Sequence, residues 1–125
     1  MDFDSSQPIY RQIIDFYKRK LARGELSPGD RIPSQREYAE RAQVNPNTVQ
    51  RAYREMEMMQ MVETIRGQGT FITATEKKQR DLQTEMAGQI MDRFIYDMRS
   101  LGFRDQELIG LIDLHLASEK GDVEK

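Results

Sequence analysis

Several residue types are missing or rare in this chain of 125 residues. There is no cysteine and no tryptophan, and the only histidine is His115. Without cysteine the chain forms neither a disulfide framework nor a thiol nucleophile, and one histidine leaves no Cys/His zinc cluster. We therefore expect no metal site and no cofactor. Paired carboxylates alone do not indicate an enzyme, because 21 acidic residues make chance pairs common.

Long apolar runs are also absent. The longest uncharged apolar run is far too short to cross a bilayer. The first four residues, MDFD, are acidic where a secretory signal would be basic and then apolar. With 38% hydrophobic and 32% charged residues and only 8 glycines and 4 prolines, the composition is typical of a helix-leaning globular chain. We expect a cytoplasmic protein with one compact core and no membrane partner.

Charge of one sign is not in excess. The formal net charge is −2, which disfavours indiscriminate binding to polyanions. Residues 1–75 hold 11 bases and 10 acids, whereas residues 76–125 hold 8 bases and 11 acids. Any nucleic-acid binding must therefore come from bases gathered on one surface of the first part.

Helix signals are clear in the first part of the chain. An apolar period that opens at Pro8 and stops at Gly24 predicts a helix over about 8–23. Ser34 and Glu37 form a capping-box pattern in which each side chain satisfies the other's backbone N–H, and this predicts a helix over about 35–42. Asn45-Pro46 then predicts the start of a third helix, with an N-cap side chain followed by proline at the first helical position.

The third helix has two different faces. One face is mostly apolar and the opposite face carries hydrogen-bonding side chains. The residues of the first face are Val49, Ala52, Tyr53, Met56 and Gln60, and those of the second are Asn47, Gln50, Arg51 and Arg54. From position 61 the pattern changes to β-branched and aromatic residues over 61–66 and 70–73, joined by Gly67-Gln68-Gly69. This predicts a β-hairpin with a glycine-flanked tip.

The last fifty residues predict two apolar helices. One carries apolar residues at four-residue steps from Leu82 to Met98, Leu101-Gly102 breaks it, and a second helix follows from Asp105. Both helices are apolar over wide faces, so we expect them to need a partner surface. The residues expected to form a dimer interface are Ile90, Phe94, Leu108, Ile109, Leu111, Ile112 and Leu116.

The order of the elements predicts a fold that is mainly α with a small β-hairpin. Residues 1–75 are expected to form a winged helix-turn-helix DNA-binding domain, and residues 76–125 a two-helix dimerisation tail. In a winged helix the third helix enters the major groove and the hairpin tip reaches the neighbouring DNA. Gln50 suits adenine, and arginines suit guanine or phosphate. The residues this favours for DNA contact are Arg36, Asn47, Thr48, Gln50, Arg51, Arg54 and Arg66.

Four segments resemble the GntR family of bacterial transcription regulators. They are residues 8–13 (PIYRQI), 24–39 (GELSPGDRIPSQREYA), 44–53 (VNPNTVQRAY) and 66–71 (RGQGTF). The resemblance implies a winged helix that binds a palindromic operator as a homodimer. Carried over residue by residue, it places DNA contacts at Arg36, Asn45, Asn47, Thr48, Gln50, Arg51, Arg66, Gly67 and Gln68.

One position departs from the family pattern. Gln60 stands where the family usually has glycine between the recognition helix and the wing. A left-handed conformation costs a non-glycine residue roughly 1 kcal/mol, so we expect the helix to run on by a residue or to end differently.

The tail is similar to that of the YtrA-type subfamily. The similarity lies in Leu101-Gly102-Phe103 between the two helices and Glu107-Leu108-Ile109 in the second. It implies a tail that dimerises in a regulator that commonly represses operons for ABC-type membrane transporters. Two alternatives stay open: a winged helix that binds only proteins, and a regulator gated by a small-molecule effector at the dimer or domain–tail interface.

Overall fold

The computed structural model describes residues 3–124, and their side chains as far as Glu119. The elements in chain order are α1 (Ile9–Ala22), β1 (Arg31–Ile32), α2 (Gln35–Ala42), α3 (Pro46–Met58), β2 (Val62–Ile65), β3 (Gly69–Ile72), α4 (Glu76–Ser100) and α5 (Asp105–Glu124). The chain divides into two compact units, Met1–Glu85 and Met86–Lys125, and the division falls inside α4. The expected fold class is confirmed: a mainly helical chain with a small antiparallel sheet.

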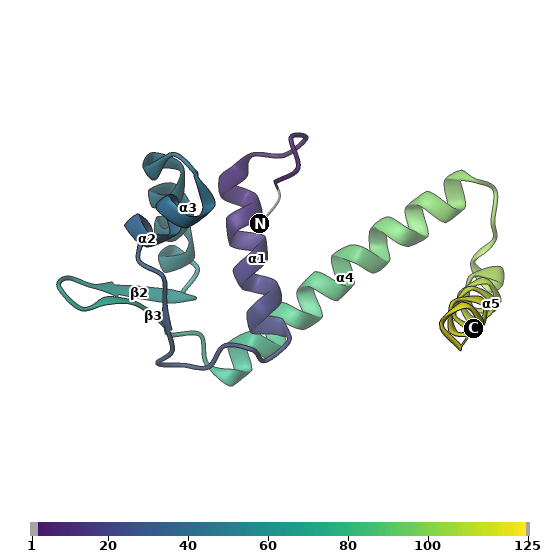
Figure 1. Ribbon diagram of the computed structural model, residues 1–125. Helices are drawn as coiled ribbons and strands as arrows, with labels where there is room; N and C mark the ends of the chain where they lie inside the picture. The colour runs from purple at the N-terminus through teal and green to yellow at the C-terminus, as the bar shows by residue number, and fades with distance from the viewer. Residues whose placement is uncertain (1–2, 125) are drawn as a thin grey trace. The chain divides into compact units, whose positions relative to one another are not determined.

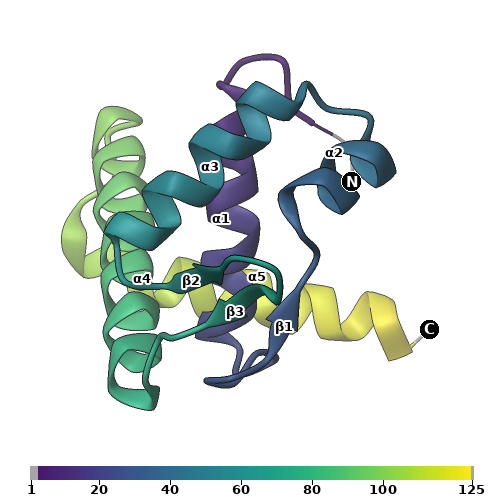
Figure 2. The ribbon, with the colours of Figure 1, turned by 90° about the vertical axis from the view of Figure 1, so that its left-hand side faces the viewer.

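The core of the first unit lies between α1, α3 and the sheet. Figure 2 shows α3 crossing α1, with the three strands below the crossing. The apolar face expected for the third helix is buried except at Gln60, which lies beyond the end of the helix and is exposed. The fully buried side chains of the core include Ile13, Leu21, Val49, Tyr53, Met56, Met61 and Ile72. Leu82 also belongs to this core, so the first turns of α4 complete the winged helix.

The hairpin is part of a three-stranded sheet. β2 and β3 pair antiparallel from Val62 opposite Ile72 to Ile65 opposite Gly69, as the residue pattern predicts. β1 pairs with the other edge of β3, which gives the order β1-β3-β2. The sequence does not predict β1 as a strand, because a two-residue strand shows no period of its own.

Gln60 adopts the left-handed conformation, with φ of 61°, so the expectation that the chain avoids it was wrong. Its N–H donates to the Glu57 carbonyl and the Met61 N–H to the Met56 carbonyl, each at 2.9 Å. These two bonds form the Schellman motif that usually ends in glycine, and α1 ends in the same way at Gly24. The satisfied carbonyls and the buried Met56 and Met61 offset the backbone strain.

The second unit contains the rest of α4 and all of α5. Within its described residues, Leu108 is the only large apolar side chain that is buried. The exposed large apolar residues are Ile90, Met91, Tyr96, Leu101, Phe103, Ile109, Leu114 and Leu116. Among the helices that the structure describes, none combines the length and apolarity needed to span a bilayer. The same residues contain no group of three acidic or histidine side chains placed to hold a metal ion.

Candidate nucleic-acid interface

The exposed face of α3 is built from polar side chains held by a capped first turn. The Asn45 side-chain oxygen accepts the Asn47 N–H at 2.8 Å, and Pro46 takes the first helical position. This cap fixes where the helix starts and leaves the Asn45 amide NH2 free to donate. Asn47, Gln50, Arg51 and Arg54 are exposed, and Thr48 is half-buried. The helix therefore offers hydrogen-bond donors along one face and apolar side chains to the core.

α2 presents Arg36 at its start. The Ser34 hydroxyl accepts the Glu37 N–H at 3.1 Å, which is one half of the expected capping box. The other half is not formed, because the Glu37 carboxylate instead lies 3.5 Å from Arg31 and 3.6 Å from Arg41. The Arg36 side chain is 90% exposed and meets Glu40 at 3.2 Å. Such an exposed pair contributes about 0.5 kcal/mol or less, so a phosphate can replace Glu40.

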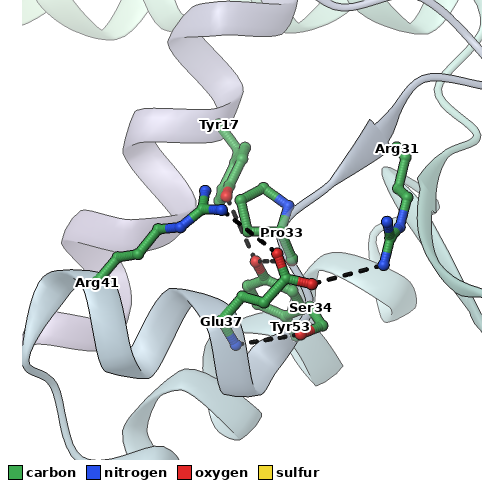
Figure 3. Close-up of polar contacts among 7 residues, drawn as sticks. All are labelled: Tyr17, Arg31, Pro33, Ser34, Glu37, Arg41 and Tyr53. Carbon is green, nitrogen blue, oxygen red and sulfur yellow. Dashed lines mark hydrogen bonds and ion pairs between the residues drawn. The ribbon is translucent and has the colours of Figure 1, made fainter.

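A buried tyrosine links α3 to the start of α2 (Figure 3). The Tyr53 hydroxyl on α3 donates to the Pro33 carbonyl at 2.6 Å, one residue before the Ser34 cap. The Tyr17 hydroxyl lies 3.4 Å from that of Tyr53. Burial raises the pKa of both phenols, and it raises the pKa of neighbouring Tyr38 to about 12. Tyr53 therefore stays protonated and keeps donating at neutral pH.

The sequence pattern identified Tyr53 as core but missed this hydrogen bond. The available signal was a tyrosine in place of phenylalanine at a buried helical position, because a buried phenol usually finds a polar partner. Its partner is twenty residues away in the sequence, so no local pattern names it.

The hairpin forms a wing whose tip is a tight turn. The Gln68 N–H donates to the Ile65 carbonyl at 2.9 Å, and Gly67 has a φ of 81°, as in the third position of a type II turn. Arg66, Gly67 and Gln68 are all exposed. The wing is also held to α3, because the Thr64 N–H donates to the Glu57 carboxylate at 2.8 Å. The tip is therefore presented from a hairpin anchored to the recognition helix.

Glycine is required at the start of β3. Gly69 has a φ of 132°, and a Cβ there would lie 2.7 Å from the Arg31 Nε of β1. Arg31 thus passes close beneath the wing and also approaches Glu37 of α2. A larger residue at position 69 would be strained at this φ and would force the end of the Arg31 side chain to move.

The predicted DNA-contacting residues come from three elements that lie on the same side of α1 in Figure 1. All of them except Thr48 are exposed. Arg54 and Arg66 make no ion pair with any residue that the structure describes, so their charges are available to a ligand. The elements are α2, with Arg36; α3 and its cap, with Asn45, Asn47, Thr48, Gln50, Arg51 and Arg54; and the wing, with Arg66, Gly67 and Gln68.

The residues expected at a dimer interface fall into three environments within the second unit. Leu108 is buried, with 7% of its surface exposed. Phe94, Leu111 and Ile112 are half-buried and line a groove of about 390 Å³ together with Leu116. Ile90, Ile109 and Leu116 are exposed. Three further residues that were not among those expected at the interface are exposed as well: Tyr96, Leu101 and Leu114.

The chain has this order of helices and strands, a polar face on α3 and a wing with Arg66 at its tip. These features define a DNA-binding winged helix-turn-helix regulator. The profile described as "Bacterial regulatory proteins, gntR family" matches residues 9–72. The chain belongs to the GntR family of transcriptional regulators. It is a DNA-binding regulator, and its relatives are regulators and not enzymes.

Similar proteins cover most of the chain. The "Uncharacterized HTH-type transcriptional regulator YhcF" of Bacillus subtilis (strain 168) is 45% identical over 107 residues, which are 86% of this chain and 88% of that protein. The "HTH-type transcriptional repressor YtrA" of the same organism is 47% identical over 77 residues, which are 62% of this chain and 59% of YtrA. A solved GntR family transcriptional regulator from Listeria monocytogenes has a TM-score of 0.82 at 35% identity, covering 89% of this chain and 97% of that one.

Proposed function

We propose that the protein is a homodimeric, sequence-specific repressor that binds a palindromic operator. The observation that carries this proposal is the exposed set of hydrogen-bonding side chains on α3, flanked by Arg36 of α2 and Arg66 of the wing. A protein-binding winged helix would present an apolar face there, and this face is polar.

The contacts divide into two roles. Arginines and the first-turn amides of α3 suit phosphates, which give affinity without reading sequence. Gln50 suits a bidentate pair with adenine, and Arg54 suits guanine. Both side chains are exposed and project from the middle of α3. Sequence preference is therefore assigned mainly to Gln50, and overall affinity to Arg36 and Arg66.

Dimerisation is assigned to the second unit. Ile90, Ile109 and Leu116 are exposed, and apolar surface of this extent favours contact with another apolar surface. A two-fold axis would place two recognition helices in successive major grooves about 34 Å apart, which matches a palindromic operator.

Repression of a transporter-type operon that includes the protein's own gene is part of the same proposal. The support is the name of YtrA, which is a transcriptional repressor, and the resemblance of the tail to the YtrA-type subfamily. We assign the protein to the cytoplasm, where an operator is accessible.

The first test is binding to DNA from just upstream of the protein's own gene. A mobility-shift assay at two salt concentrations, with unrelated duplex as competitor, should give a discrete complex of two chains per operator. The proposal fails if every duplex binds equally or if no complex forms. In that case the search turns to protein partners of the winged helix.

Two variants test the division of roles. Gln50→Ala should change the preferred operator sequence with little effect on the salt dependence, whereas Arg36→Ala should weaken all duplexes alike. Arg19→Ala is the matched control, because Arg19 is an exposed arginine with a similar pair, to Asp15 at 2.7 Å. Equal losses of preference and affinity in both variants would contradict the division.

A further inference from the structure

Tyr10, in the first turn of α1, lies between two arginines. The Arg51 guanidinium carbon is 3.8 Å from the centroid of the Tyr10 ring, which is the distance of a stacked contact. The Arg11 Nε donates to the Tyr10 hydroxyl at 3.1 Å, and its guanidinium carbon is 5.8 Å from the ring centroid. One aromatic ring therefore orients one arginine of α1 and one arginine of the recognition helix.

Neither arginine has a strong carboxylate partner. The ion pair between Arg51 and Glu55 is 3.5 Å long and exposed, and Arg11 makes no ion pair with any described residue. Asp15, one turn along α1 from Arg11, is paired with Arg19 at 2.7 Å. Both guanidinium groups belong to exposed residues, so their donors remain available to an anion.

The position of Arg11 is unfavourable without an anion. A cation in the first turn of a helix opposes the helix dipole, and α1 has no acidic residue in that turn. Two guanidinium groups beside the same ring also repel each other. A bound anion removes both penalties, and arginine is the side chain that best matches phosphate geometry.

We propose that Tyr10, Arg11 and Arg51 form a backbone-phosphate site that extends the DNA interface from α3 onto the start of α1. Arg11 and Arg51 bind the phosphate, and Tyr10 is a positioning residue that fixes the two guanidinium groups. This inference rests on the proposed DNA binding, and it assigns Arg51 to phosphate and not to guanine. The proposed interface then includes the wing, α3 and the start of α1. Within it, α3 carries the base contacts.

The test uses the full-length protein and a duplex that the wild-type protein selects from a random pool. Arg11→Gln changes both chains of the proposed dimer, so it should reduce the slope of log affinity against log salt by up to about 1.8, which is about 0.9 for each half-site. It should weaken binding about tenfold at moderate salt and leave the sequence preference unchanged. Arg19→Gln, which removes a paired arginine from the same helix, should leave both the affinity and the slope as they are.

Replacing single phosphates of that duplex by neutral methylphosphonates locates the contact. The wild-type protein should lose affinity at one flanking linkage per half-site, and the Arg11→Gln variant should lose less there, because only Arg51 is left to bind that phosphate. Tyr10→Leu should weaken binding to the unmodified duplex as Arg11→Gln does, because both guanidinium groups lose their orientation. Tyr10→Phe keeps the ring under Arg51 and should retain most of the affinity, with thermal melting confirming that each variant is folded.

The outcomes separate the two proposals. If Arg11→Gln and Tyr10→Leu match Arg19→Gln at every linkage while the wild-type protein binds its duplex, the phosphate site is wrong and the proposed function stands. If the wild-type protein selects no duplex at all, both are overturned.

Discussion

In the first unit most of the large apolar side chains of α1, α3 and the sheet are buried, whereas in the second unit most of them are exposed. The first unit also satisfies its polar groups internally, for example through Tyr53 on the Pro33 carbonyl. The second unit buries only Leu108 among its described large apolar residues. The first unit is therefore stabilised by its own packing, whereas the second unit has exposed apolar surface that is available for assembly.

The largest expected effect is on the packing of the first unit. Ile13 is fully buried in its core, so Ile13→Ala should lower the free energy of unfolding by about 2–5 kcal/mol. Leu114 is 69% exposed, so Leu114→Ala should affect stability only by weakening the proposed dimer. That effect should depend on protein concentration. Urea denaturation at two protein concentrations measures both. Similar losses in the two variants, independent of concentration, would contradict the comparison.

The next largest effect concerns assembly. Ile109 is 74% exposed on α5, so Ile109→Glu should convert the proposed dimer to monomer. The apparent operator affinity should fall about 100-fold or more, because the second half-site is no longer held at high effective concentration. Sedimentation equilibrium checks the oligomeric state. Met58→Glu is the control, because Met58 is 75% exposed but belongs to the first unit, and this variant should remain dimeric.

Stability at high pH gives a third contrast. Burial raises the pKa of Tyr17, Tyr38 and Tyr53, whereas unfolded tyrosine titrates near pH 10. Between about pH 10 and pH 12 the unfolded chain binds fewer protons than the folded one, so the free energy of unfolding falls as pH rises through that window. Below pH 10 the contribution is fully present. Urea denaturation across that window should show a shallower fall for Tyr38→Phe, and an unchanged profile would be contrary evidence.

The smallest effect is at the end of α3. Gln60 has a φ of 61°, so Gln60→Gly should remove strain and raise the free energy of unfolding by about 0.5–1 kcal/mol. Gln83, exposed inside α4, is the control, because Gln83→Gly should instead cost about 1 kcal/mol. Thermal unfolding of the two variants should shift in opposite directions. A loss of stability on Gln60→Gly would mean that the glutamine side chain stabilises this end of the helix.

Local signals predicted most of the first unit. The structure places the first three helices within a residue or two of their predicted ends, because Pro8, Gly24, Ser34 and Asn45-Pro46 act through neighbouring backbone groups. The polar side chains of α3 are exposed as its period predicts. Local period and capping were sufficient there because one buried face decides the orientation of a helix.

Contacts between residues far apart in the chain were not predictable in this way. The pairing of β1 with β3 depends on a surface that exists only after the hairpin has formed. The stacking of Arg51 on Tyr10 joins α3 to α1, and no spacing rule connects the two positions. At Gln60 a local penalty of about 1 kcal/mol was outweighed by the burial of Met56 and Met61, which only the folded core supplies.

The burial of Leu82 determines where this protein can be cut and rejoined. A fragment that stopped after the hairpin would leave uncovered the part of the core that Leu82 fills. A fragment that continued to Glu85 would keep Leu82 in the core and would end within α4. Exchange of tails between related regulators is therefore simplest by splicing in helical register just after residue 85. At that point a different tail can be attached while the core of the first unit stays intact.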